Sequence, residues 1–425
     1  MTRLNLSSGP GAYDGLIWSS VGAREMRILL SEGSGLTSRQ VAGRLGALGH
    51  EVEILSSTRV CLSRFTRQVR AVHEVPRFGR DPFGWLAAAE RIAAARRIDL
   101  LFPTQEQVTV LSARLPRLGV PTIVPPFKSL ARVQDKVSAF RTLEAAGVPQ
   151  PWTALITRAE DLRGITIYPV FLKRPVSTAS SGVRRARSAD ELAAAAHELG
   201  VGASELIAQV QVSGPLAMVQ AVADHGRLTA HHACLRVREG VGGGAALKQS
   251  IVLPGLRDML VRLIGTLDWH GGLSMDVIIG DDGPVIIDVN PRLVEPANAL
   301  AAGVDLVGAM LDAATGGSGP ERPAGAAGVR TRQTLLAILG AAQQHGTRTA
   351  VLREAINAIF ARADYAGCAE ELTPVTGDLR AAIPVLVALA ASLIRPSLWR
   401  RFHAGAVGPY AVTPEAWAEI VAAAA

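Results

Sequence analysis

Gly271–Leu293, with the sequence GGLSMDVIIGDDGPVIIDVNPRL, is the stretch that decides the fold, because it predicts a β-hairpin with polar side chains on one face. Both arms are short apolar runs, and the Asp-Asp-Gly segment 281–283 suits a three-residue loop with its glycine in the left-handed region. Such a loop places Asp276 opposite Asp288. The hairpin therefore brings two carboxylates together.

The alternation of side chains along a strand adds an amide and a guanidinium to the same face. Asn290 and Arg292 follow Asp288 in steps of two, so all three share one side of the hairpin. The opposite side is expected to pack in a core through Val285, Ile287 and Val289.

Two carboxylates directly opposite each other destabilise a bare sheet. A divalent cation reverses the sign of that interaction, and carboxylate and amide oxygens suit Mg²⁺ whose shell is completed by phosphate oxygens. Asp276, Asp288 and Asn290 are therefore the candidate metal ligands. The alternative is a polar surface hairpin in which Asp281 and Asp282 serve only as turn residues.

The run IIDVNPR, residues 286–292, resembles the E-x-N-x-R strand of the ATP-grasp ligases. In that family another acid stands on the partner strand, where this chain has Asp276; Asp288 replaces the commoner glutamate and shortens the reach to a metal. The resemblance implies that the three candidate ligands hold Mg²⁺, with Mn²⁺ as the alternative ion. It also implies that Arg292 contacts the transferred phosphate or the acyl phosphate made from it.

Lysine is scarce in this chain, since the 44 basic residues include only Lys128, Lys136, Lys173 and Lys248. A single amphipathic helix is predicted around Lys136, ending at Gly147. Lys173 ends a strand, and a loop of small residues follows that could hold phosphates through its backbone N–H groups, with Ser177, Ser180, Ser181 and Gly182 as candidates. Taken singly, each lysine is more often a surface charge. Their order and spacing resemble the two nucleotide lysines of the ATP-grasp fold.

The segment Leu206–Val219 predicts an apolar strand broken by Ser-Gly-Pro, and it is the candidate adenine hinge. Its proposed nucleotide contacts are Gln209, Gln211 and Val212. Leu216 stands where the family usually has the acid that binds ribose. The alternative for most of this strand is plain core.

Residues 26–125 predict a small parallel α/β domain, because the strand, helix and strand that follow Met26 form a βαβ unit. Gly33 and Gly35 lack the third glycine of a dinucleotide fingerprint, so NAD is not predicted. The resemblance implies that this domain lines the substrate side of the cleft. Glu106 and Arg64 are the candidate substrate contacts, with ordinary surface residues as the alternative.

A glycine run, 242–244, predicts a mobile segment flanked by basic residues. Arg236, Arg238 and Lys248 are candidates to approach the phosphoryl group, and the alternative is a solvated hairpin with exposed charges. The histidines near this segment have no visible partner in the sequence and are interpreted as structural: His231, His232 and His270.

Composition narrows the class of protein. The net charge of +7 comes from scattered arginines, and only 4% of the residues are aromatic, which argues against nucleic-acid binding. Three cysteines without close spacing and the lack of an apolar leader predict a cytoplasmic protein. The apolar run 381–394 is too short to span a bilayer. It predicts a buried helix or a homodimer contact, and a membrane-surface contact through residues 381–402 or a port for a greasy substrate is the alternative.

These patterns predict four parts: an extension (1–25), the α/β domain (26–125), an ATP-grasp domain of two α+β subdomains (126–318) and a mostly helical region (319–425). The function implied is an ATP-grasp carboxylate-amine ligase, which activates a small carboxylate as an acyl phosphate and joins it to an amine. The alternatives are a carboxyphosphate-forming carboxylase or carbamoylase and a non-catalytic ATP-binding regulator.

Overall fold

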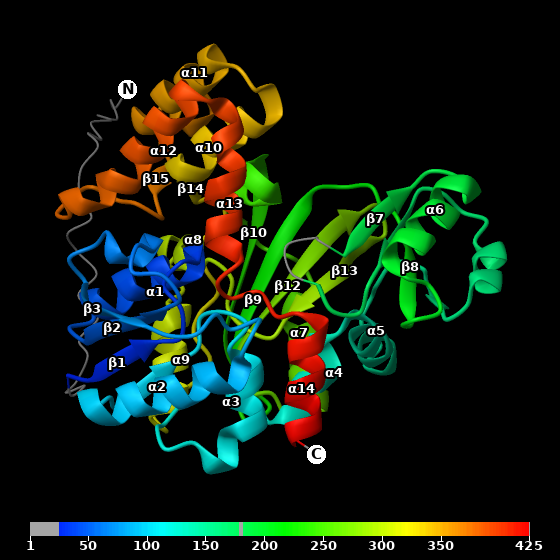
Figure 1. Ribbon diagram of the computed structural model, residues 1–425, viewed down its shortest axis with the longest axis horizontal. Helices are drawn as coiled ribbons and strands as arrows, with labels where there is room; N and C mark the ends of the chain where they lie inside the picture. The colour runs from blue at the N-terminus through cyan, green and yellow to red at the C-terminus, as the bar shows by residue number, and fades with distance from the viewer. Residues whose placement is uncertain (1–24, 178–181, 425) are drawn as a thin grey trace, which may run out of the picture.

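The computed structural model describes residues 25–177 and 182–424. In Figure 1 a parallel α/β unit lies at the lower left, a large antiparallel sheet runs through the centre, a small lobe stands at the right, and most of the C-terminal helices lie at the top. These parts confirm the predicted fold class. The predicted N-terminal extension lies outside the described residues, except for residue 25.

The N-terminal unit is a four-stranded parallel sheet flanked by helices. Its elements are β1 (Arg27–Leu30), α1 (Leu36–Ala47), β2 (Glu51–Ser56), β3 (Val69–Glu74), α2 (Pro82–Arg96), β4 (Leu100–Phe102) and α3 (Val108–Arg114). The order β3-β2-β1-β4 contains the predicted βαβ unit, β1-α1-β2. Strand β3 is not among the predicted strands, because VRAVHE mixes charged and apolar residues and lies half-exposed at the sheet edge.

The helix predicted around Lys136 is wrong in one respect, because two helices replace it: α4 (Phe127–Gln134) and α5 (Lys136–Ala145). Asp135 between them is extended, and its side chain caps α5 by accepting from Ser138 N–H at 2.8 Å. The break leaves the Lys136 N–H free to donate to the Pro175 carbonyl at 2.9 Å. The capping aspartate thus fixes Lys136 beside the loop that follows Lys173.

The small lobe is a four-stranded antiparallel sheet, order β5-β8-β6-β7, covered by one helix. Its elements are β5 (Thr153–Ile156), β6 (Val170–Lys173), β7 (Val183–Ala186), α6 (Ala189–Leu199) and β8 (Leu206–Val210). Apolar residues of α6 such as Leu192 pack on Leu172 and Leu206 of the sheet. The remaining face of β6 and β8 carries Lys173 and Gln209.

The central sheet has seven strands in the order β13-β12-β9-β10-β11-β14-β15. Its elements are β9 (Leu216–Asp224), β10 (Arg227–Glu239), β11 (Ala245–Ile251), α7 (Leu256–Leu267), β12 (Gly271–Gly280), β13 (Gly283–Asn290), β14 (Arg330–Arg332) and β15 (Ala369–Glu370). Helix α7 packs its apolar face, including Leu260 and Leu263, against Val219 and Met275. One face of the sheet is thereby buried, and the other carries the polar residues.

The chain after the hairpin adds these helices: α8 (Ala297–Ala301), α9 (Leu306–Ala314), α10 (Thr334–His345), α11 (Arg348–Ile359), α12 (Ala382–Ile394), α13 (Trp399–Val407) and α14 (Pro414–Ala424). Strands β14 and β15 extend the central sheet, so the region after residue 318 is joined to it. Helix α14 returns to pack on α3, next to the central sheet (Figure 1). The boundaries of the four parts stay predictions.

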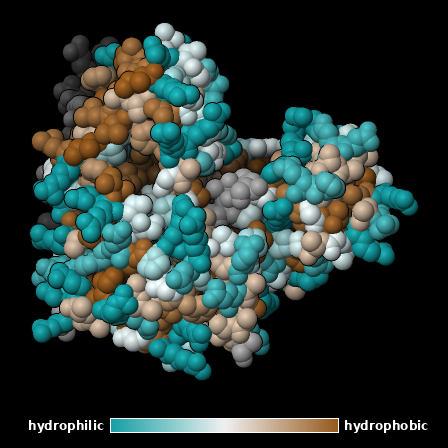
Figure 2. All heavy atoms as spheres, in the orientation of Figure 1, coloured by the Kyte–Doolittle hydropathy of each residue, from teal (hydrophilic) through white to brown (hydrophobic). Residues whose placement is uncertain are grey.

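Helix α12 is only partly buried. Val385, Ala388 and Ser392 face the protein, whereas Leu386 is 58% exposed and Val387 is 52% exposed. Figure 2 shows apolar side chains gathered over this upper part of the molecule. Full burial of the run 381–394 is therefore wrong, and the homodimer and membrane-surface contacts stay predictions. Within residues 25–177 and 182–424, no helix is both long and apolar enough to cross a membrane.

Candidate active site

The hairpin of β12 and β13 is confirmed, but its loop differs from the prediction. Gly280 pairs with Gly283, so the loop has two residues. A register shift next to Asp276 then inserts Ile287 as a bulge and restores the predicted pairing of Asp276 with Asp288. Because the bulge changes the side-chain alternation, Ile286 rather than Ile287 enters the core.

The polar face of this hairpin has the electrostatics of a cation site. Burial, and then the facing Asp288 carboxylate, raise the pKa of Asp276 to about 7. A divalent cation between the two carboxylates would remove that repulsion. Asn290 lies two residues beyond Asp288, at the register position opposite Ser274. The donor set of Asp276, Asp288 and Asn290 therefore fits Mg²⁺ or Mn²⁺.

Both predicted nucleotide lysines reach this hairpin. The Lys136 ammonium lies 3.8 Å from Asp288 Oδ1 and donates to the Ser177 carbonyl at 3.4 Å. The Lys173 ammonium donates to Gln209 Oε1 at 2.7 Å and to the Ile287 carbonyl at 2.9 Å. Burial lowers the pKa of Lys173 to about 8, although the charge of Asp288 opposes the shift. Two cations from separate elements thus converge beside the candidate metal ligands.

The loop after Lys173 retains a polar group without a partner. Ser177 Oγ is buried and bonds to no described residue. A Cβ at Gly182 would lie 2.7 Å from Ser177 Cβ, so only glycine allows this close approach. Ser180 and Ser181 lie outside the described residues. The ends of the loop therefore form a narrow cradle next to Lys136.

The predicted adenine hinge connects the small lobe with the central sheet. Gln209 is buried, and its side chain is engaged by Lys173 and by Thr153 Oγ1, which lies 3.2 Å from Gln209 Nε2. Gln211 accepts from Arg185 at 2.8 Å. A Cβ at Gly280 would lie 3.1 Å from Val212 Cγ1, so Val212 lies against the hairpin end. Their roles in nucleotide binding stay predictions.

Arg292 and Glu106 come from different units and form a buried ion pair. Arg292 Nη2 donates to Glu106 Oε1 at 3.0 Å, while Arg292 Nε is buried without a partner among the described residues. Gln134 of α4 donates to the other Glu106 oxygen at 3.4 Å. The structure thus brings Glu106, predicted from the loop after β4, to the arginine of the metal hairpin.

Tyr410 is a neighbour of this ion pair that the sequence did not indicate. Burial raises its pKa to about 12, and the charges of Arg292 and Glu106 also act on it, which places the phenol near that ion pair. It follows α13, about 120 residues after the hairpin in a segment without a recognisable motif. Only the packing of the C-terminal part reveals it.

Of the three basic residues predicted to approach the phosphoryl group, only Arg236 lies near the hairpin. Arg236 donates to the Gly243 carbonyl at 2.6 Å. Its charge opposes the rise in the pKa of Asp276, so it lies near the hairpin. Arg238 is a correction: a register shift between the two arginines turns it toward the C-terminal helices, where it pairs with Glu354 and Asp364.

Lys248 is a second correction, because it is fully buried rather than part of a mobile flap. Its ammonium pairs with Glu295 at 2.7 Å and with Glu371 at 2.6 Å. These two carboxylates raise its pKa against the opposing effect of burial. The lysine therefore joins the segment after the hairpin to the C-terminal part.

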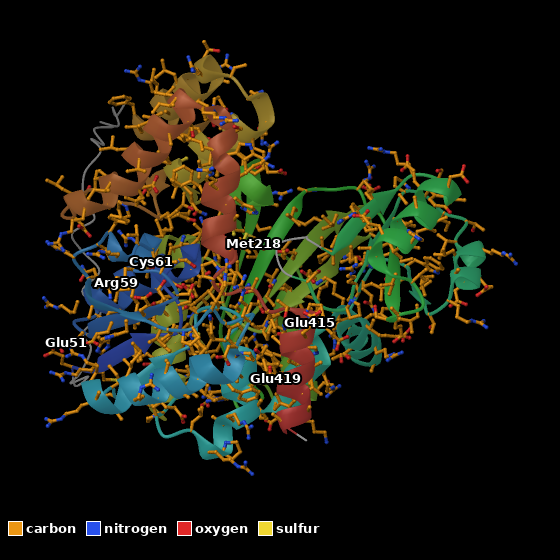
Figure 3. All side chains as sticks on the ribbon, in the orientation of Figure 1. Glu51, Arg59, Cys61, Met218, Glu415 and Glu419 are labelled. Carbon is orange, nitrogen blue, oxygen red and sulfur yellow. The ribbon has the colours of Figure 1, made fainter. Side chains whose placement is uncertain are left out.

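Arg64 is a third correction. Its side chain is exposed and donates to the Arg59 carbonyl at 3.0 Å. Figure 3 labels Arg59 in the N-terminal unit, far to the left of Met218, which is the register partner of Asp276. Arg64 thus lies on the outer surface and not at the cleft.

The three histidines have partners in the structure. His232 lies 2.9 Å from Asn298 Oδ1, His231 lies 3.3 Å from Glu321, and His270 lies 3.4 Å from Asp224. None of the three histidines is therefore added to the candidate catalytic residues.

Comparison with known proteins identifies the central part of the chain. Residues 133–296 match the model of the family described as ATP-grasp domain. The vancomycin B-type resistance protein VanB of Enterococcus faecalis is 29% identical over 140 residues, which are 32% of this chain and 41% of that protein. The chain thus matches less than half of that relative's length.

Solved structures of other proteins share the fold of this chain. Biotin carboxylase from Campylobacter jejuni has a TM-score of 0.59 at 16% identity, covering 72% of this chain and 74% of that one. An L-amino acid ligase from Bacillus licheniformis has a TM-score of 0.54 at 14% identity, covering 69% and 75%. Residues 133–296 therefore match the ATP-grasp domain that the hairpin motif predicts, and the solved structures show the same fold.

Proposed function

We propose that the protein is an ATP-dependent ligase that activates a small carboxylate as an acyl phosphate and joins it to an amine, releasing ADP and phosphate. The observation that carries this proposal is the convergence of Lys136 and Lys173 on the hairpin of Asp276 and Asp288. Cations and metal ligands at one place suit the terminal phosphates of ATP. We further propose a cytoplasmic location, since all three cysteines are free.

The metal would be held by Asp276, Asp288 and Asn290, and when bound it neutralises phosphate charge during transfer. Lys136 and Lys173 supply point charges from the two sides of the cleft. The Ser177 hydroxyl, which has no partner among the described residues, and the close approach of Gly182 support a phosphate cradle at the ends of the loop. These groups orient the nucleotide before any substrate bond changes.

Arg292 is the group suited to the acyl phosphate. Its Nη2 donates to Glu106, which also accepts a hydrogen bond from Gln134. The buried Nε of Arg292 donates to no described residue. A guanidinium held in this way can stabilise charge that develops on the transferred phosphoryl group. Glu106 is then a positioning residue, and Arg236 supplies a second positive charge near Asp276.

A carboxylase that uses carboxyphosphate is the second candidate, because the fold resembles that of biotin carboxylase. Both chemistries need the same phosphate and metal groups, so the acceptor decides between them. A non-catalytic ATP-binding regulator is the third candidate, and Leu216 at the expected ribose position favours it.

The test is incubation of the full chain with ATP and Mg²⁺, with and without a pool of the common amino acids as carboxylates and amines. We expect phosphate release that requires the pool. Phosphate release that requires only bicarbonate would favour the carboxylase. Nucleotide binding without phosphate release under either condition would contradict both enzymatic proposals.

A further inference from the structure

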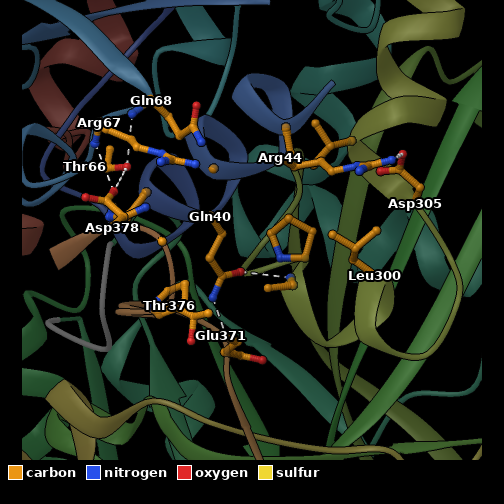
Figure 4. Close-up of a pocket in the computed structure, with 18 of the residues that line it drawn as sticks. Gln40, Arg44, Thr66, Arg67, Gln68, Leu300, Asp305, Glu371, Thr376 and Asp378 are labelled. Atoms are coloured by element: carbon orange, nitrogen blue, oxygen red, sulfur yellow. Dashed lines mark hydrogen bonds and ion pairs between the residues drawn. The ribbon is translucent and has the colours of Figure 1, made fainter. Parts of the chain in front are cut away.

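A pocket of about 260 Å³ lies outside the ATP cleft, where the N-terminal unit meets the C-terminal part (Figure 4). Its walls come from α1, from residues 66–68, from residues 296–307 and from residues 371–378. None of the residues proposed above for nucleotide, metal or phosphoryl contacts lines it. The pocket is therefore a separate feature of the fold.

Arg39 of α1 lines this pocket and is 3% exposed. Its Nε is buried without a hydrogen-bond partner, and no carboxylate in the described part of the chain lies within 4.0 Å of the guanidinium. Burial lowers the pKa of Arg39, while the charges of Asp378 and Glu370 act on it from farther away. Burial of a guanidinium without a direct partner is unfavourable, so an anion bound in the pocket would stabilise this side chain.

The other buried or half-buried charged groups of the pocket are already engaged, and Arg67 is exposed. Arg44 donates to Asp305 Oδ2 through two nitrogens, at 3.0 and 2.7 Å. Asp378 accepts from the Thr66 hydroxyl at 2.6 Å. Figure 4 shows both pairs on the pocket wall. Among the described residues, Arg39 is thus the buried pocket group whose charge is available to a ligand.

The rest of the wall limits the chemistry of that ligand. Apolar side chains face the same space, namely Ala47, Pro296, Ala297, Leu300, Leu306, Val307 and Pro374. A bare phosphate would make no contact with these apolar side chains. A carboxylate with a short apolar body would contact both the Arg39 guanidinium and the apolar wall. The volume suits a small metabolite.

We propose that this pocket binds a small aliphatic carboxylic acid, whose carboxylate pairs with the Arg39 guanidinium and whose apolar body packs on Leu300, Leu306 and Val307. A guanidinium and a carboxylate can form two parallel hydrogen bonds, which gives the pair both strength and a fixed orientation. The site is distinct from the proposed carboxylate substrate site beside Arg292.

The test measures binding of isovalerate, acetate and inorganic phosphate to the full chain by calorimetry and by thermal melting. We expect isovalerate to bind more tightly than acetate and to raise Tm, with phosphate having no effect. Arg39→Met should weaken isovalerate binding by about tenfold or more. Arg91→Met, which changes an exposed arginine of α2, is the matched control and should bind as the unchanged chain does.

The melting temperature without ligand gives a second measurement. Since no described residue pairs directly with the buried Arg39 guanidinium, Arg39→Met should melt at the same temperature as the unchanged chain or higher. If that variant does not fold, Arg39→Lys keeps the charge but loses the fork and should still weaken isovalerate binding. Lack of isovalerate binding to the unchanged chain, binding of phosphate alone, or equal affinity in the Arg39 variants would each overturn the proposal.

Discussion

The Lys173 ammonium donates to the carbonyl of Ile287 at 2.9 Å, which ties the small lobe to the metal hairpin of the central sheet. Ile287 is the bulge residue that restores the pairing of the two hairpin carboxylates. One irregularity in β13 therefore sets both the position of the candidate metal ligands and a backbone acceptor for the candidate phosphate lysine. Five predictions test the account built on this arrangement.

Asp288→Asn should abolish turnover while leaving the fold intact. The exchange keeps the side-chain volume and removes one negative charge from the candidate metal site, so we expect kcat to fall by about 100-fold or more. Phosphate release and thermal melting measure the two effects. Asp281→Asn, in the exposed hairpin loop, is the control and should keep full activity. Full activity in the Asp288 variant would refute the metal assignment.

Lys173→Arg should weaken ATP binding by about tenfold or more, because a planar guanidinium does not fit a buried site built around a compact ammonium. Calorimetric titration with ATP measures the change. Lys128→Arg makes the same exchange at an exposed position and should have no effect. An unchanged affinity in the Lys173 variant would count against its phosphate role.

ATP affinity should depend on pH through Lys173. Its pKa of about 8 means that the free protein holds the ammonium form below that pH and loses the charge as the pH rises through it. Because phosphates bind the charged form, affinity is fully present below about pH 8 and declines above it. Titrations between about pH 7 and about pH 9.5 test this range. In Lys173→Met the decline should disappear, and a decline that persists would assign it to another group.

Glu106→Gln should lower kcat more than it changes the KM for ATP, because Glu106 orients Arg292 and has no expected contact with the nucleotide. Steady-state rates at several ATP concentrations separate the two constants. Glu144→Gln, at an exposed position of α5, is the matched control. A change confined to the KM for ATP would place Glu106 in nucleotide binding instead.

The hairpin and its facing carboxylates were predictable from the sequence because charged residues in a Val- and Ile-rich strand are a strong local signal. It placed Asp276 opposite Asp288 through a loop that was one residue too long, and the bulge at Ile287 compensated for the error. Bulges have no fixed sequence signature, so this compensation was not predictable. The same limit explains Arg238, which a register shift turns away from Arg236.

Long-range packing accounts for the other differences. Lys248 looked like a flexible basic residue, because its carboxylate partners Glu295 and Glu371 stand 47 and 123 positions away in the chain. Tyr410 and Glu106 come together from opposite ends of the sequence. Such long-range contacts depend on how separate units pack together, which local sequence patterns do not specify.

The central claim is that a carboxylate is activated as an acyl phosphate. With ¹⁸O in the carboxylate substrate, the account predicts ADP and phosphate only when that carboxylate is present, with the label transferred to the phosphate and no pyrophosphate formed. The lysines and the metal hairpin support this outcome, because they are arranged for the terminal phosphates of ATP. Release of AMP and pyrophosphate, or of phosphate without label, would contradict the mechanism even though the ATP-grasp fold remains.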